Sequence, residues 1–132
     1  MILVDSSVWI DYFNGVVCVE TDRLDALLGK NAILMGDIIL TEVLQGFANE
    51  AEFKRAQKLL ALLPYRDMLG HEVAMQSTKN YRALRKQGVT VRKTVDVMIG
   101  TFCILNNIPL LHKDKDFDQM EQRLGLITVN CT

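Results

Sequence analysis

The chain has 132 residues, about the length of one domain and enough to bury a hydrophobic core of its own. Hydrophobic residues make up 49% of it and it contains only 2 prolines, which excludes a disordered or fibrous protein. A net charge of −1 excludes a protein that attracts nucleic acid through overall positive charge. We therefore predict a single globular domain over residues 1–132.

Signals for export and for disulfide formation are weak. Asp5 interrupts the apolar stretch at the N-terminus, and no apolar run is long enough to span a bilayer, which predicts a cytoplasmic protein with no membrane partner. The three cysteines (Cys18, Cys103 and Cys131) are odd in number and lack a Cys-x-x-Cys pair, which argues against both a disulfide framework and a thiolate metal site.

Short apolar runs alternate with amphipathic segments along the chain. The runs predict strands, and the amphipathic segments predict helices. The elements expected in chain order are a strand over 2–4, helices over 8–13 and 21–29, a strand over 32–35, helices over 38–47 and 49–63, a strand over 65–69, helices over 71–86 and 91–106, a strand over 109–111, a helix over 117–124 and a strand over 126–129. This alternation predicts an α/β protein with a parallel sheet covered on both faces.

Five acidic residues are expected at one edge of that sheet. Ligands of open parallel sheets collect beyond the carboxyl ends of the strands. Asp5 ends the first strand, and Asp114 and Asp116 follow the strand over 109–111. Asp96 lies early in the helix that leads to this strand, and Glu42 lies in the first two turns after the strand over 32–35. The direction of these two helices places both acids at the same edge.

Glu42 lies within the apolar stripe of its own helix, four residues after Ile38 and three after Ile39. A carboxylate that faces a core is costly unless it is paired, protonated or bound to a cation, and this helix has no Lys or Arg one turn away. Oxygen ligands without a Cys or His cluster suit Mg²⁺ or Mn²⁺. Such an ion deprotonates water and stabilises the transition state of phosphoryl transfer.

Most of these acids also have a purely structural explanation. Asp5 could cap the first helix, Asp96 could interact with a helix dipole from the first turn, and Asp114 or Asp116 could cap the last helix. Together these explanations do not account for the shared edge or for Glu42. The two histidines, His71 and His112, are not needed as ligands.

The segment 79–93 carries six basic residues and no acid. It leads directly to Asp96 and is a candidate phosphate-binding surface, although a solvated helix face is the simpler explanation. The basic residues are Lys79, Arg82, Arg85, Lys86, Arg92 and Lys93.

Four segments resemble the acidic motifs of PIN-domain ribonucleases, most closely those of the VapC-like toxins of bacterial toxin–antitoxin pairs. They are ILVDSSVWIDYF, DIILTEVLQG, TVDVMIG and LLHKDKDFDQM, and the resemblance runs from Ile2 to Val129. It implies a three-layer α/β/α fold with a central parallel sheet. It also implies an endoribonuclease that depends on Mg²⁺ or Mn²⁺ and cuts structured RNA, commonly transfer or ribosomal RNA.

The resemblance assigns roles to individual residues. By position, Asp5, Glu42, Asp96 and Asp114 match the catalytic and metal-binding acids of the family, and Asp116 matches a further acid, which we count with Asp5, Asp96 and Asp114 as a metal ligand. Ser7 matches a hydroxyl in the site. Arg85, Lys86, Arg92 and Lys93 would hold RNA phosphates that the acids repel.

The resemblance also implies partners and products. The protein would form a homodimer, and a cognate antitoxin would inhibit it by covering the acidic pocket with its C-terminal segment. We expect hydrolysis by an activated water, which leaves a 5′-phosphate and a 3′-hydroxyl.

Other functions remain open from the sequence. A receiver-type signalling domain also binds Mg²⁺ at the carboxyl edge of a parallel sheet, but it needs a phosphoacceptor Asp on a central strand and a Lys at a strand end. A PIN-like module could bind RNA or protein without cutting, although the presence of all four acids gives no reason to prefer it. A HAD-type phosphatase is disfavoured because Ser7 stands where its second Asp would be.

Overall fold

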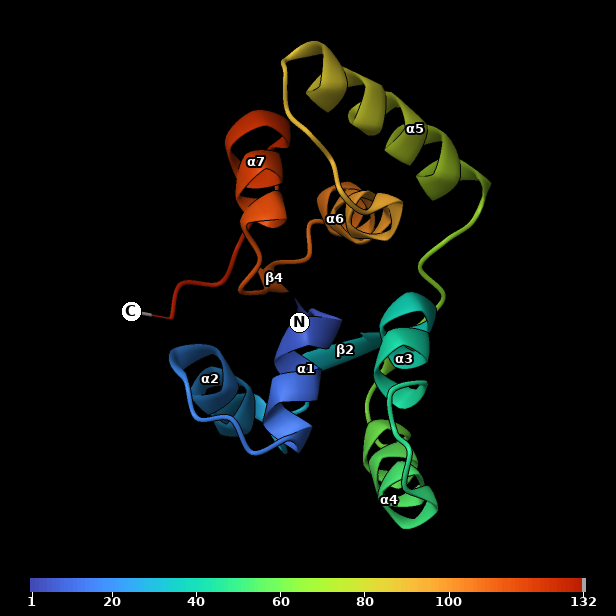
Figure 1. The fold of residues 1–132 in the computed structure, drawn as a ribbon, viewed down its shortest axis with the longest axis vertical. Helices are drawn as coiled ribbons and strands as arrows, with labels where there is room; N and C mark the ends of the chain where they lie inside the picture. Colours follow the sequence, from blue (N-terminus) through green and yellow to red (C-terminus); the bar gives the residue numbers. More distant parts are fainter. Residues whose placement is uncertain (132) are drawn as a thin grey trace.

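The computed structural model describes residues 1–131 and contains a four-stranded parallel sheet between two layers of helices (Figure 1). The strands β1 (Ile2–Val4), β2 (Ile33–Gly36), β3 (Tyr65–Arg66) and β4 (Leu110–Leu111) lie in the order β3-β2-β1-β4. The helices are α1 (Ser6–Phe13), α2 (Val19–Leu27), α3 (Asp37–Leu44), α4 (Glu50–Leu60), α5 (His71–Lys86), α6 (Thr94–Asn106) and α7 (Lys115–Leu124). The predicted α/β/α fold with a central parallel sheet is confirmed.

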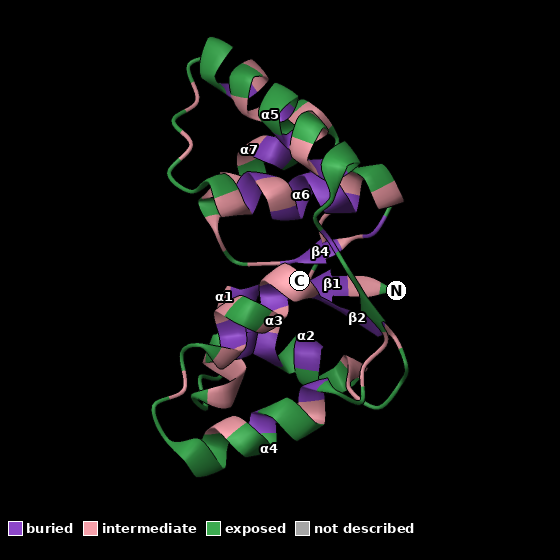
Figure 2. Ribbon diagram, turned by 90° about the vertical axis from the view of Figure 1, so that its right-hand side faces the viewer, coloured by how far each residue is buried: buried purple, intermediate pink, exposed green. Residues whose placement is uncertain are grey.

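The two faces of the sheet carry different connections. Helices α1 to α4 lie on one side, where they connect β1 to β2 and β2 to β3, and α5 and α6 return over the other side to β4 (Figure 2). Helix α1 follows β1 on the first side, and α7 follows β4 on the side of α5 and α6. The helices after β1 and β4 therefore leave on opposite faces. A pair of strands with this property is a topological switch point, where ligands bind beyond the carboxyl ends.

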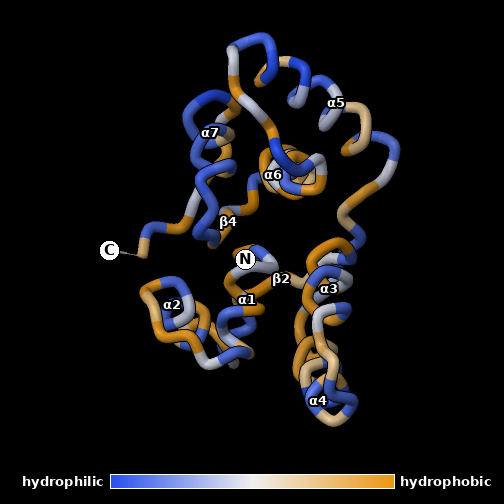
Figure 3. The backbone as a smooth tube through the Cα atoms, viewed as in Figure 1, coloured by the Kyte–Doolittle hydropathy of each residue, from blue (hydrophilic) through white to orange (hydrophobic). Residues whose placement is uncertain are grey.

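The core explains why these segments form strands and helices. Residues 3–4 and 33–35 are buried without alternation, as expected for strands covered on both faces. On one face Trp9 is fully buried and stacks on Phe13 with ring centroids 5.9 Å apart. On the other face α6 is apolar and largely buried, whereas α5 outside it is mostly hydrophilic (Figure 3). Within residues 1–131, no helix combines the length and the apolarity needed to cross a membrane.

Two predicted strands are shorter than expected. The strand predicted over 126–129 is reduced to one parallel bridge between Thr128 and Leu110. The strand predicted over 65–69 ends at Arg66, because the Asp37 carboxylate accepts a hydrogen bond from the Met68 amide at 2.9 Å and draws the chain toward α3.

Four helix starts differ from the prediction by two or three residues. The helices predicted from residues 8 and 21 each begin two residues earlier, at Ser6 and Val19. The helix predicted from residue 91 begins at Thr94, since residues 89–93 form a connection without helical structure. The helix predicted from residue 117 begins at Lys115, because Asp114 caps it by accepting a hydrogen bond from the Asp116 amide.

We expect Gly36→Ala to destabilise the fold. A Cβ atom on Gly36 would lie 2.2 Å from Sδ and 2.4 Å from Cγ of Met68, which is 1% exposed and has little room to move. Overpacking of this kind lowers the free energy of unfolding by about 1–3 kcal/mol, which urea denaturation would measure. At Gly46 the closest atom to an added Cβ is 3.5 Å away, so Gly46→Ala is the matched control. Equal effects of the two substitutions would contradict this account.

Candidate active site

All five acids selected from the sequence lie at the carboxyl edge of the sheet. Asp5 follows β1, Glu42 lies in α3, Asp96 lies in the first turn of α6, and Asp114 and Asp116 stand at the start of α7. Asp5 and Asp96 are buried, with 4% and 7% of their surface exposed. Most of these residues are far apart in the sequence, and the fold brings them together.

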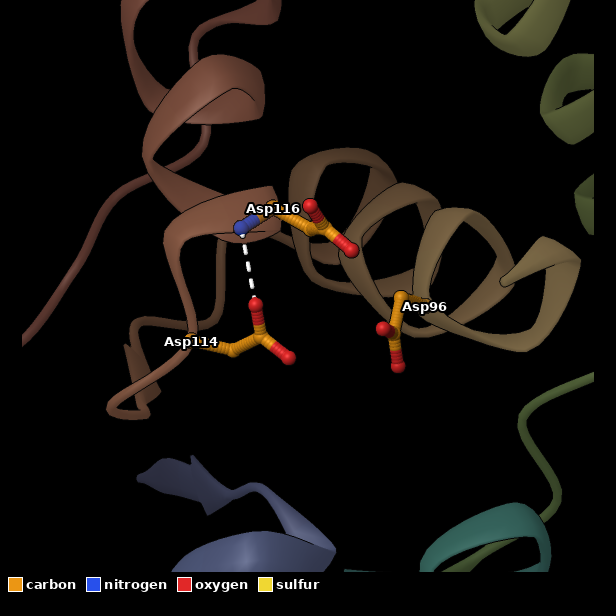
Figure 4. A group of neighbouring side chains, drawn as sticks. All are labelled: Asp96, Asp114 and Asp116. Carbon is orange, nitrogen blue, oxygen red and sulfur yellow. Dashed lines mark hydrogen bonds between the residues drawn. The ribbon is translucent and has the colours of Figure 1, made fainter. Parts of the chain in front are cut away.

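Asp96, Asp114 and Asp116 form the tightest group. One carboxylate oxygen from each lies within 4.8 Å of the corresponding oxygens of the other two. The three side chains converge from α6 and from the start of α7 (Figure 4). Oδ1 of Asp114 accepts the Asp116 amide at 2.9 Å, so the capping explanation is correct for Asp114. Its capping role leaves the Asp114 carboxylate beside Asp96.

Asp5 is held by its own helix. Its Oδ2 accepts a hydrogen bond from the Ser7 hydroxyl at 2.5 Å and from the Ser7 amide at 3.3 Å, so Asp5 caps α1. Its Oδ1 is buried and has no hydrogen-bond partner in the described part of the chain. Capping therefore explains one oxygen of Asp5 and leaves the other unexplained.

Ser6 is a site residue that the sequence analysis missed. Its hydroxyl donates to Oε1 of the half-buried Glu42 at 3.0 Å and so links α1 to α3. The two residues are 36 positions apart, and no local pattern indicates such a contact. The Asp-Ser-Ser sequence offers two hydroxyls, of which Ser7 holds Asp5 and Ser6 holds Glu42.

Burial makes negative charge costly at this edge. Desolvation raises the pKa of Asp5 and of Glu42, although hydrogen bonds from Ser7 and Ser6 partly oppose the increase. The pKa of Asp96 is raised to about 7, first by burial and then by the negative charges of Asp5 and other acids, while Lys93 lowers it. A cation beside these carboxylates would reverse the direction of these shifts.

The donor atoms fit a divalent metal ion. Oδ1 of Asp5 and Oδ2 of Asp96 are both buried, and neither has a hydrogen-bond partner within residues 1–131. Buried polar atoms almost always have a hydrogen-bond partner. Two buried carboxylate oxygens without a partner at one edge of the sheet therefore indicate a binding site for a ligand. A set of carboxylate oxygens suits a hard ion such as Mg²⁺ or Mn²⁺.

The four basic residues selected from the sequence divide into two groups. Arg92 and Lys93 lie beside the acids: Nε of Arg92 is 3.3 Å from Oδ2 of Asp116, and the charge of Lys93 acts on Asp96. Arg85 and Lys86 lie in the exposed last turn of α5, at the far end of the connection that leads to α6 (Figure 1). The fold thus brings only the first pair to the acidic edge.

His112 has structural contacts at the end of β4. Its side chain is 8% exposed, and its ring centroid is 5.0 Å from that of Phe117. Its Nδ1 accepts a hydrogen bond from the Asp114 amide at 3.2 Å. His112 therefore fixes the turn between β4 and α7.

Comparison with known proteins gives consistent matches. Residues 2–122 match the PIN-domain family. Ribonuclease VapC11 of Mycobacterium tuberculosis is 30% identical over 120 residues, which cover 89% of this chain and 90% of that protein. Ribonuclease VapC1 of Methanocaldococcus jannaschii is 32% identical over 127 residues, which cover 95% of this chain and 84% of that protein.

Solved structures share the fold. The chain aligns with the structure of VapBC2 from Rickettsia felis bound to a DNA fragment from their promoter, with a TM-score of 0.77, 18% identity and 98% of each chain covered. It also aligns with VapBC-1 from nontypeable Haemophilus influenzae, with a TM-score of 0.72, 22% identity and coverage of 99% and 98%. At these identities the likeness establishes the architecture.

We expect Asp96→Asn to stabilise the protein at pH 8 in EDTA. The pKa of Asp96 is about 7 in the folded state, above its ordinary value of 3.8, so the folded state binds this proton more tightly than the unfolded state does. The free energy of unfolding therefore falls as pH rises from about 4 to about 7. Removing the charge of Asp96 should raise the free energy of unfolding at pH 8 by about 1–2 kcal/mol, a value that allows for the partial solvation of this carboxylate. Thermal unfolding between pH 5 and pH 8 measures it.

Asp22→Asn is the matched control, since Asp22 is an exposed acid in the first turn of α2. It should change stability little at either pH, because an exposed first-turn acid gains only a small favourable dipole interaction. A pH dependence of Asp96→Asn that parallels the wild type would contradict the assignment.

Proposed function

The chain belongs to the PIN-domain family and, within it, to the VapC ribonucleases, and from this premise we propose that its acidic edge hydrolyses RNA with the help of Mg²⁺ or Mn²⁺. The observation that carries the proposal is the convergence of acids with two buried, unpartnered carboxylate oxygens. The proposed nuclease is a single domain over residues 1–132. Its proposed substrate is a structured RNA, either transfer or ribosomal.

Four acids would hold the metal ion. Asp96, Asp114 and Asp116 are close enough to share one ion. Asp5, which directly follows β1, would contribute its buried Oδ1. A divalent cation bound here would lower the pKa of a water molecule and would neutralise negative charge on the phosphate. The chain contributes the fixed positions of these carboxylates.

Glu42 is the proposed base of the reaction. Burial raises the pKa of this carboxyl group, which makes its ionised form a better proton acceptor, and the Ser6 hydroxyl fixes Oε1. The water oxygen bonds to phosphorus, its proton passes to Glu42, and the bond from phosphorus to the 3′-oxygen breaks. The 3′-oxygen leaves as an alkoxide and takes a proton from solvent water, which gives the 3′-hydroxyl. The phosphate stays on the 5′-oxygen of the downstream fragment and forms its new 5′ end, and Glu42 then releases its proton to solvent. Ser7 supports the reaction by orienting Asp5.

Basic residues would compensate for the repulsion between the acids and RNA. Arg92 and Lys93 lie next to the acidic edge, and Arg85 and Lys86 continue the basic surface along the end of α5. Phosphate contacts of this kind position RNA without reading its sequence. We assign the binding of the scissile strand to the first pair and of a more distant phosphate to the second.

A cognate antitoxin is the proposed protein partner. Solved structures with this fold are named as VapBC assemblies. An apolar groove between α1 and α3, lined by Ile10, Phe13, Val43 and Phe47, continues from the helix that carries Glu42 and would accept a partner segment. The homodimer and the cytoplasmic location expected from the sequence remain parts of this proposal.

Asp5→Asn should strongly reduce RNA cleavage while leaving the fold intact. The amide keeps an oxygen that can cap α1 but loses the charge that a metal ion requires. We expect the rate of cleavage in Mg²⁺ or Mn²⁺ to fall by about a hundredfold or more, which corresponds to about 3 kcal/mol of lost transition-state stabilisation. Total RNA incubated with each protein and mapped at nucleotide resolution measures the rate and the cut sites.

EDTA should abolish cleavage by the wild type, and the exposed Asp22→Asn variant should cut as the wild type does. The new 5′ ends should carry a phosphate. Products with a 2′,3′-cyclic phosphate would refute hydrolysis by water, since they would show that the ribose hydroxyl is the nucleophile. RNA binding without turnover at any metal concentration would instead favour a non-cleaving module.

A further inference from the structure

Arg92 spans two of the acids with one guanidinium group. Its Nε lies 3.3 Å from Oδ2 of Asp116, and its Nη2 lies 3.5 Å from Oδ1 of Asp116 and 3.6 Å from Oδ1 of Asp114. These acids are two of the three whose oxygens converge with that of Asp96. A positive charge supplied by the chain itself therefore lies against the group proposed to hold a metal ion.

The guanidinium group and a divalent cation would compete for these carboxylates. A metal ion needs the lone pairs of the coordinating oxygens, and the N–H groups of Arg92 are directed at the oxygens of Asp116. The two positive charges would also repel each other at such short range. Binding of one therefore weakens binding of the other.

Arg92 is well placed to move. Its side chain is 67% exposed, and it stands in the non-helical connection between α5 and α6. Exposed ion pairs contribute little stability, so the contact is easily exchanged. A guanidinium group released here would still lie beside the site, and its planar set of donors matches a phosphate group.

We propose that Arg92 is an exchangeable counter-ion, which neutralises Asp114 and Asp116 until a divalent cation binds and then becomes a ligand for an RNA phosphate. This inference rests on the proposed metal-dependent nuclease function and deepens it. Arg92 would link the two binding events, because the guanidinium group that the metal ion displaces from the acids is the group that then binds the RNA phosphate. Metal binding thereby prepares the site for RNA.

The test compares Mn²⁺ binding and RNA binding in wild type and Arg92→Gln. Isothermal titration calorimetry should show that Arg92→Gln binds Mn²⁺ about three- to tenfold more tightly, because the competing charge is gone. Fluorescence anisotropy with a labelled transfer RNA in Ca²⁺ should show weaker binding and a salt dependence reduced by about one phosphate contact. If Arg92 had a purely structural role, Arg92→Gln would weaken the binding of both Mn²⁺ and RNA. Tighter Mn²⁺ binding together with weaker RNA binding therefore distinguishes the proposed exchange from a structural role.

Two controls separate the specific contact from general electrostatics. Arg55→Gln removes an exposed arginine on α4 and should leave both affinities unchanged. In an Asp116→Asn background, Arg92→Gln should improve Mn²⁺ binding by less than it does in the wild type, because the contact that it relieves is already weakened. An equal gain in both backgrounds would overturn the direct exchange.

The outcomes also distinguish this inference from the proposed function. Saturable Mn²⁺ binding to the wild type with no change in Arg92→Gln would overturn the exchange alone. Absence of Mn²⁺ binding to either protein would overturn the metal centre and the exchange with it.

Discussion

The parallel pairing of β1 with β4 is the constraint on which the site depends. Val4 is in register with Leu111, and the Asp5 amide donates to the Leu111 carbonyl at 2.9 Å. This hydrogen bond places the acid after β1 beside the turn that carries Asp114. Since the helices after these strands leave on opposite faces, neither covers the space beyond the carboxyl ends. The switch point thus creates the site before any acidic side chain is considered.

The chain tolerates the resulting concentration of negative charge by small, separate compensations. Ser7 and Ser6 donate hydrogen bonds to Asp5 and Glu42, and Arg92 partly neutralises the acids at the start of α7. These contacts are incomplete, because burial still raises the pKa of Asp5, Glu42 and Asp96. The buried charges therefore lower the stability of the fold at the acidic edge, as is common at functional sites.

The sequence predicted the layers and the acidic edge well, because both depend on local patterns. Apolar runs mark buried strands, and an acid directly after a strand can lie only at its carboxyl end. The contact between Ser6 and Glu42 and the pairing of Arg92 with Asp116 were not predictable, since they join separate elements. The strand expected over 126–129 shrank to one bridge because an apolar run does not specify how many residues pair.

Helix capping and metal binding, which appeared as competing explanations of the acids, are compatible in this fold. Asp5 caps α1 with Oδ2 and keeps Oδ1 for the site, and Asp114 caps α7 while its carboxylate stays beside Asp96. A cap fixes the rotamer of the side chain, and the positive end of the helix dipole favours its ionised form. The helices therefore hold the oxygens of the proposed metal site in place, which would reduce the entropic cost of binding an ion.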